Sequence, residues 1–143
     1  RPKDKLISMH LLANTIVFTS QGIPFLHAGA EFLRTKNGDS NSYKSPDAIN
    51  KLDWELKAEN EEIYQYYKEL IKMRKEHPVF RLKTTEEIQK RLSFSDTQDL
   101  VIAYQLDGSN LPEETWKNVF IAFNGSDEKQ TVQLPTGPHH NKS

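Results

Sequence analysis

Residues 21–54 read QGIPFLHAGAEFLRTKNGDSNSYKSPDAINKLDW, and this stretch decides how the chain is interpreted. It opens with a short apolar run that ends in His27-Ala28-Gly29, and it continues without a helix signal as a long polar loop. An apolar strand that leads into a polar loop is how a barrel or an open α/β sheet presents ligand-binding groups. The loop offers such groups in quantity: Arg34, Asp39, Asn41, Tyr43, Asp47, Asn50, Asp53 and Trp54.

Two helices are expected to flank this loop. Apolar residues cover most of the circumference of Asp4–Ser20, which predicts a helix buried on more than one side. Gly22 ends that helix, and Ile23–Leu26 is typical of a short buried strand with Pro24 near its start. Helix, strand, loop and helix follow one another as in a parallel α/β fold.

The second helix is predicted over Glu61–Glu76. Asn60 is a good N-cap, and His77-Pro78 stops the helix. One amphipathic stripe is predicted to run along it, formed by Ile63, Tyr67, Leu70, Ile71 and Arg74.

The pattern changes after Pro78. Val79–Leu82 is strand-like, and Thr84–Ile88 favours a short helix with a capping box between Thr84 and Glu87. Short β-rich runs separated by turn signals then predict an antiparallel sheet over Leu100–Leu106, Val119–Asn124 and Thr131–Leu134. We expect a domain boundary near Pro78, with domains at residues 1–78 and 79–143.

Composition excludes several function classes. With 19 basic and 20 acidic side chains in 143 residues, no strong attraction to nucleic acid or anionic lipid is expected. No run approaches the ~20 apolar residues of a membrane span, and the absence of cysteine excludes disulfides and thiol ligands. The first residues indicate an internal start, and composition does not distinguish a cytoplasmic from a secreted or periplasmic protein.

No cofactor or metal is expected. Asp39–Tyr43 is only faintly similar to a calcium loop, and the adjacent His139 and His140 have no third ligand at metal spacing. The sequons at Asn124 and Asn141 are interpreted as a turn and a tail. His27 is expected as a buried, hydrogen-bonded ring, and Trp54 as a core anchor.

An ordered set of motifs carries a specific resemblance. The set comprises Gln21-Gly22-Ile23-Pro24, His27-Ala28-Gly29, Glu31-Phe32-Leu33-Arg34, Asn41-Ser42-Tyr43, Asp47 and Asp53-Trp54. From about Arg1 to Pro135 the chain closely resembles the C-terminal part of pullulanases, in glycoside hydrolase family 13 of the α-amylase superfamily. It departs from the family at Ala30, where the family often carries an acid, and in a shorter β-sandwich.

The resemblance implies a fold and an activity. The fold is α/β followed by all-β: the last βα unit of a (β/α)8 TIM barrel and a partial C-terminal antiparallel β-sandwich. The parent enzyme would cleave α-1,6-glucosidic branch linkages in pullulan, starch or glycogen by a retaining mechanism, which needs two carboxyl groups roughly 5–5.5 Å apart. Those acids lie on earlier barrel strands of the family. None of Glu31, Asp39, Asp47 and Asp53 is therefore expected to be catalytic. Glu31 is assigned to a structural polar network, with Arg34 as its candidate partner.

The resemblance to pullulanases also implies binding partners for this chain. A branched α-glucan or oligosaccharide would contact a set of loop side chains, namely Arg34, Asp39, Asn41, Tyr43, Asp47 and Asn50. The alternative for these residues is a loop hydrogen-bonded to itself. The chain would also pack against the remainder of the parent barrel or self-associate.

Two other functions stay open. One is an α-amylase or isoamylase-type relative, and the other is a stand-alone noncatalytic glycan-binding or scaffold module.

Overall fold

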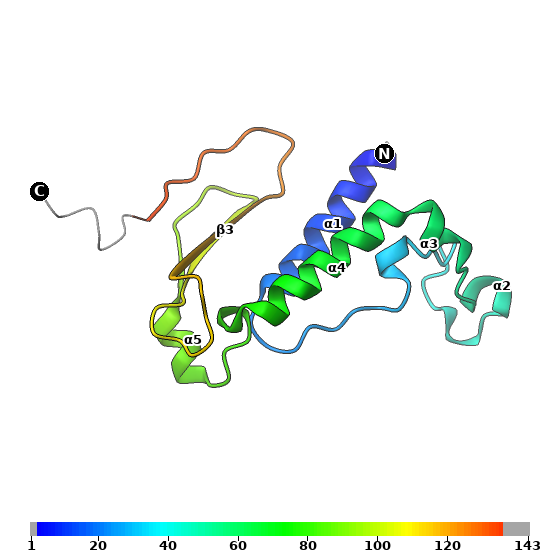
Figure 1. Cartoon of the computed structure of the whole chain (residues 1–143). Helices are drawn as coiled ribbons and strands as arrows, with labels where there is room; N and C mark the ends of the chain where they lie inside the picture. The colour runs from blue at the N-terminus through cyan, green and yellow to red at the C-terminus, as the bar shows by residue number, and fades with distance from the viewer. Residues whose placement is uncertain (1–2, 136–143) are drawn as a thin grey trace, which may run out of the picture. The chain divides into compact units, whose positions relative to one another are not determined.

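The computed structural model describes residues 3–135. Its elements in chain order are α1 (Lys3–Thr19), η1 (Ala30–Phe32), η2 (Ser42–Lys44), α2 (Asp47–Asn50), α3 (Glu55–Glu59), α4 (Glu61–Glu76), η3 (Pro78–Phe80), α5 (Thr85–Arg91), β1 (Leu92–Phe94), β2 (Val101–Asp107) and β3 (Asn118–Asn124) (Figure 1). None of the helices formed within these residues is long and apolar enough to cross a membrane.

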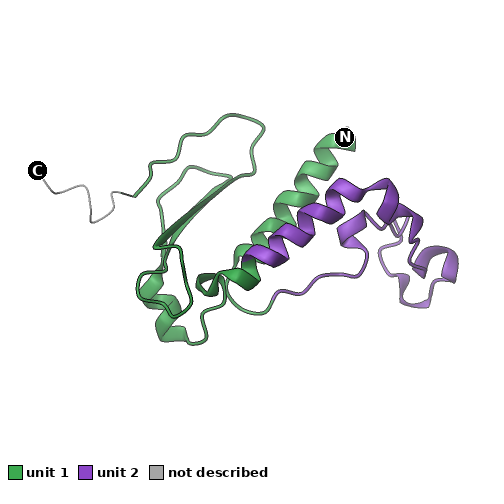
Figure 2. Cartoon of the chain, viewed as in Figure 1, with its two compact units in different colours: residues 1–23, 74–143 green, residues 24–73 purple. Residues whose placement is uncertain are grey.

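The chain forms two compact units (Figure 2). Unit 1 is drawn from residues 1–23 and 74–143, and unit 2 comprises residues 24–73. Unit 1 contains α1 and the sheet, and unit 2 contains the polar loop and most of α4. The domain boundary near Pro78 stays a prediction.

Helix α1 forms where the sequence predicts it, but it is less buried than expected. Only Phe18 and Thr19 are buried, whereas Leu6 is 50% and Met9 43% exposed. A helix that is apolar all round needs neighbours on more than one side. Within unit 1 only the C-terminal end of α1 is buried. The expected burial of α1 on several sides is therefore wrong for this chain by itself.

Arg74 binds the chain just beyond the end of α1. Its guanidinium donates to the carbonyl oxygens of Phe18 and Ser20 at 2.8 Å each and to that of Gly22 at 2.6 Å. The last carbonyls of a helix have no intrahelical partner and carry partial negative charge. A cation that is only 5% exposed therefore satisfies three acceptors at once. Burial, followed by the nearby Arg81 charge, lowers the pKa of Arg74.

Two further side chains anchor the same end of α1. The Gln21 amide donates to the Val79 carbonyl at 2.8 Å and accepts from the Leu82 amide at 3.0 Å. The Tyr104 hydroxyl lies 3.0 Å from the Thr19 hydroxyl and 3.2 Å from the Thr19 carbonyl, and burial raises the pKa of Tyr104. The end of α1 is thereby fixed to η3 and to β2.

Helix α4 has the predicted bounds. Glu61 and Glu62 lie in its first turn and Arg74 and Lys75 in its last, as the helix dipole favours. Within the predicted stripe, Tyr67, Leu70 and Arg74 are 1%, 8% and 5% exposed, whereas Ile71 is 40% exposed and its assignment is wrong.

The chain after α4 forms the predicted antiparallel sheet, in the order β1-β2-β3. Leu106 of β2 pairs with Leu92 of β1 and with Val119 of β3, and it is fully buried. Helix α5 precedes the sheet, and one half of the predicted capping box is present, because the Thr84 hydroxyl accepts from the Glu87 amide. The Glu87 carboxylate accepts from Arg91 instead.

Three predicted strands do not form within the described residues of this chain by itself. Ile23–Leu26 forms no strand, and Ile23 and Phe25 are 97% and 89% exposed, because no described strand pairs with this segment. Val79 and Phe80 are buried but lie in η3, because Pro78 has no amide to donate and opens a helical turn. Thr131–Leu134 is not a strand in the described structure.

Strand β1 was not predicted. It comprises three residues and follows α5 without an intervening turn, so no sequence signal separates the two elements.

We predict that Arg74→Met lowers the free energy of unfolding by about 2–4 kcal/mol, because buried carbonyls lose a charged donor. Lys72→Met is the matched control on the same helix, since the Lys72 side chain is 60% exposed. Urea unfolding at equal protein concentration measures both variants. Equal midpoints for the two variants would contradict the role assigned to Arg74.

We also predict that the chain self-associates in solution. The exposed side chains of Ile23 and Phe25 each gain about 1.5–3 kcal/mol when fully buried. Light scattering should show species larger than the 16.6 kDa chain, and Ile23→Ser with Phe25→Ser should reduce them. A monodisperse wild-type monomer with a cooperative melt is the opposing result.

Candidate functional site

The polar loop of unit 2 begins at a tight turn around Gly29. The Gly29 amide donates to the Glu31 carboxylate at 3.0 Å, and the Gly29 carbonyl accepts from the Arg34 amide at 2.9 Å. Gly29 has a φ of 94°, and a Cβ there would lie 2.6 Å from the Arg34 Cβ. Glycine is therefore required. Glu31 has the predicted structural role, with Gly29 rather than Arg34 as its partner.

A second turn spans Lys36 to Asp39. Asn37 and Gly38 have φ values of 53° and 83°, and the Asp39 amide donates to the Lys36 carbonyl at 3.0 Å. Two successive positive φ angles favour an Asn-Gly pair. The Asn37-Gly38 pair is a turn signal that can be recognised in the sequence alone.

The Asp39 carboxylate is hydrogen-bonded within its own loop. Its carboxylate accepts from the Asn41 amide at 2.9 Å and from the Ser45 hydroxyl. The hydrogen bond from Ser45, followed by that from the Asn41 amide, holds the pKa of Asp39 below its usual range. Asp39 thus closes a turn as a carboxylate.

Asn50 joins three parts of the loop. Its side-chain oxygen accepts from the Lys36 ammonium at 2.6 Å, and its side-chain nitrogen donates to the carbonyls of Ser42 at 2.8 Å and Ser45 at 2.6 Å. The Asn50 carbonyl also accepts from the guanidinium of Arg34, which donates to the Ala28 carbonyl at 3.2 Å. Arg34 Nε is buried and has no partner among the described residues. Arg34 and Asn50 therefore have internal partners.

Asn41, Tyr43 and Asp47 are placed differently, because all three are exposed. Tyr43 is 73% exposed, and the Lys44 ammonium lies 5.2 Å from the centre of its ring. Asp47 begins α2. Within residues 3–135, the Asn41 and Asp47 side chains form no hydrogen bond with the protein. An amide, a phenol ring and a carboxylate on one loop can bind a hydroxyl-rich ligand.

The remaining expectations in this loop are partly wrong. Trp54 is 65% exposed and contacts buried Phe32 with ring centres 5.6 Å apart, so it covers the core of unit 2 instead of anchoring inside it. His27 is exposed, because the segment before it is not covered by a sheet. The Asp53 carboxylate accepts from the Glu55 amide at 3.1 Å.

No metal centre is formed by residues 3–135, since no three His, Cys, Asp or Glu side chains there are placed to hold an ion. His139, His140 and the Asn141 sequon lie outside the described residues. The Asn124 sequon forms a turn as predicted, in which Asn124 accepts from the Ser126 amide at 2.9 Å and donates to the Glu128 carbonyl at 2.7 Å.

Unit 1 holds a buried ionisable group that the sequence did not reveal. The Glu114 carboxylate is fully buried and lies 2.8 Å from His77 Nδ1, and it accepts from the amides of Val79 at 3.0 Å and Trp116 at 2.9 Å. The Trp116 ring stacks on His77 at 3.4 Å. Burial raises the pKa of Glu114, but these hydrogen bonds outweigh it and hold the pKa below its ordinary value. Through these hydrogen bonds Glu114 holds its loop against η3.

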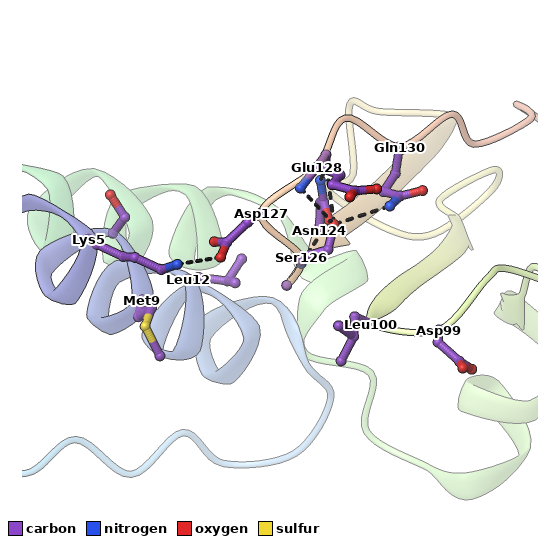
Figure 3. A pocket seen from close by; sticks show the side chains of 12 residues that line it. Lys5, Met9, Leu12, Asp99, Leu100, Asn124, Ser126, Asp127, Glu128 and Gln130 are labelled. Atoms are coloured by element: carbon purple, nitrogen blue, oxygen red, sulfur yellow. Dashed lines mark hydrogen bonds and ion pairs between the residues drawn. The ribbon is translucent and has the colours of Figure 1, made fainter. Parts of the chain in front are cut away.

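Unit 1 also has an open hollow of about 810 Å³ between α1 and the turn after β3 (Figure 3). Lys5 and Asp127 form an ion pair across it at 2.5 Å, and Met9, Leu12 and Leu100 supply apolar surface. None of the predicted site residues lines this hollow.

Comparison with known proteins identifies the family. Residues 33–142 match the family model described as alpha-1,6-glucosidases, pullulanase-type, C-terminal. A pullulanase of Bacillus subtilis (strain 168) is 39% identical over 128 residues, which is 90% of this chain and 18% of that protein.

Solved structures agree. A Paenibacillus barengoltzii pullulanase in complex with maltohexaose and α-cyclodextrin superposes with a TM-score of 0.89 at 41% identity, over 94% of this chain and 21% of that chain. An Anoxybacillus sp. LM18-11 pullulanase with maltotetraose gives 0.88 at 39% identity, over 96% and 20%. The chain thus spans about a fifth of the length of these relatives. It belongs to the pullulanase-type α-1,6-glucosidase family and corresponds to the C-terminal region of its members.

Proposed function

We propose that this chain is part of a debranching enzyme that hydrolyses α-1,6-glucosidic bonds in branched α-glucans. Family membership supports this proposal, because the matched relatives are named pullulanases. In this proposal residues 1–78 form the last βα unit of the catalytic barrel, and residues 79–143 begin the C-terminal β-sandwich. The order α1, extended segment, loop and α4, followed by antiparallel strands, agrees with that division.

The exposed segment between α1 and η1 supports the barrel assignment. Ile23 and Phe25 are among the most exposed apolar side chains of the described chain. In a closed barrel the last strand would pair with its neighbours and such side chains would be covered. We propose that residues 23–26 form this strand in the complete enzyme.

The catalytic carboxylates belong to other parts of that enzyme. A retaining mechanism needs a nucleophile and a proton donor facing one glycosidic bond. The nearby acids have other roles: Glu31, Asp39 and Asp53 each accept a backbone hydrogen bond within their own loop, and Asp47 starts a short exposed helix. The positions of these four acids agree with a structural role and not with a catalytic one.

The observation that carries the substrate assignment is the exposure of Asn41, Tyr43 and Asp47 on an otherwise self-bonded loop. We assign these three side chains to contacts with glucose residues. Hydroxyl groups of a glucan would meet the amide and the carboxylate, and the apolar face of a sugar would stack on the Tyr43 ring. The maltooligosaccharides in the related crystals are ligands of this chemistry.

The proposal predicts that the isolated chain does not hydrolyse pullulan, whereas the complete enzyme releases maltotriose from it. The chain by itself lacks the acid pair that supplies proton transfer and charge stabilisation. Reducing-sugar assays on both proteins, with pullulan and amylose as substrates, make the test. Hydrolysis by the chain alone would refute the proposal, and preference of the complete enzyme for amylose would favour an amylase-type relative. A silent chain that binds maltotriose as tightly as the complete enzyme would favour a glycan-binding module.

In the complete enzyme, Tyr43→Ala and Asp47→Ala should each raise the KM for pullulan with little loss of stability. A sugar hydroxyl that loses its Asp47 partner costs about 1–3 kcal/mol, so we expect Asp47→Ala to raise KM about 5- to 150-fold. Loss of stacking on the Tyr43 ring should raise KM by a comparable factor. Ser40→Ala is the matched control, because Ser40 is an exposed neighbour in the same loop. If both variants keep the KM of the control, the loop does not contact substrate.

A further inference from the structure

Asn50 is held in one orientation by its three side-chain partners. Its oxygen faces the Lys36 ammonium at 2.6 Å, and its nitrogen faces two carbonyl oxygens at 2.8 and 2.6 Å. Turning the amide over would place the oxygen against two carbonyls and the nitrogen against a cation. Only one orientation is compatible with these neighbours.

The two carbonyls belong to residues on either side of Tyr43. They are the carbonyls of Ser42, which opens η2, and of Ser45, which follows η2. The Ser45 amide also donates to the Ser42 carbonyl at 3.0 Å, and the Ser45 hydroxyl donates to Asp39. Asn50 therefore fixes both ends of the single turn that carries Tyr43.

Lys36 contributes a positive charge to this arrangement. Its ammonium lies 2.6 Å from Asn50, and it also contributes, after the hydrogen bonds from Ser45 and Asn41, to the lowered pKa of Asp39. Hydrogen bonds with a charged partner are about twice as strong as neutral ones. Lys36 is thus the strongest single constraint on the side-chain amide of Asn50.

We propose that Lys36 and Asn50 are positioning residues that hold Asn41, Tyr43 and Asp47 in the geometry that binds the sugar. The inference rests on the proposed function of the loop, and it moves Asn50 from the substrate contacts to their support. Lys36 acts through Asn50, and Asn50 acts through the backbone of residues 42–45. Neither side chain touches the substrate.

The test uses the complete enzyme with the variants Lys36→Met, Lys36→Arg and Asn50→Asp. Asn50→Asp replaces the donor with an acceptor facing two carbonyls. Lys36→Met removes the ammonium, with its charge and its hydrogen bond to Asn50, and it remains informative if Asn50→Asp does not fold. Lys51→Met is the matched control, because it removes an exposed charge directly after α2. Amide hydrogen exchange over residues 39–50 and steady-state kinetics on pullulan are measured for each variant.

We expect Lys36→Met to speed amide exchange over residues 42–50 by about 10-fold and to raise KM by about 5- to 20-fold with kcat within about twofold. Lys36→Arg should recover most of both effects, because it restores a charged donor. In the Tyr43→Ala background the effect of Lys36→Met on KM should fall by at least about half, since the two residues act in series. Lys51→Met should change neither exchange nor KM.

Three results would overturn the inference. If exchange rises and KM stays unchanged while Tyr43→Ala still raises KM, the proposed function survives and the positioning role is wrong. If KM rises without faster exchange, Lys36 touches the substrate itself. If Tyr43→Ala and Asp47→Ala also leave KM unchanged, the loop has no sugar contacts to position, and the substrate assignment fails together with the inference.

Discussion

The interaction on which unit 1 depends is that of the Arg74 guanidinium with the three carbonyls at the end of α1. A buried cation costs desolvation energy, and unpaired helix carbonyls cost a comparable amount, so each group makes the burial of the other possible. Because Arg74 lies in the last turn of α4, it fixes where α1 ends relative to that turn. Gln21 and Tyr104 extend the same junction to η3 and β2. The sheet is therefore positioned by polar contacts at one helix end, supported by the buried apolar residues of β2.

The sequence predicted the elements whose formation depends on interactions between residues close together in the chain. Helices α1, α4 and α5 have the expected positions because periodicity, dipole charges and the Thr84 cap act within a few residues. The two long strands follow from β-rich runs between turn signals. Residues 23–26 show the limit, because a strand is defined by its partners and none is present among the described residues. Val79 and Phe80 were recognised as apolar, yet the proline before them selects a helical turn.

The candidate site was also predicted only in part. The sequence identified a polar loop with sugar-compatible groups, but it could not separate side chains that hold the loop from side chains that are free. Asn50 and Arg34 are adjacent only after the chain has turned at Gly29 and at Asn37-Gly38. Their roles inside the loop depend on tertiary contacts, which no local sequence pattern indicates. The same holds for Glu114, whose partners His77 and Val79 are more than thirty residues away along the chain.

The hydrogen bonds of this loop also bear on which of its residues can vary. Arg34 and Asn50 bond to main-chain carbonyls, and these are present whatever side chains the bonded residues carry. The path of residues 41–47 is therefore largely independent of the identities of the exposed side chains at 41, 43 and 47. Under the proposed function, mutations at those positions would change the sugar contacts and leave the backbone conformation of the loop in place. Sugar preference and fold stability would then evolve separately.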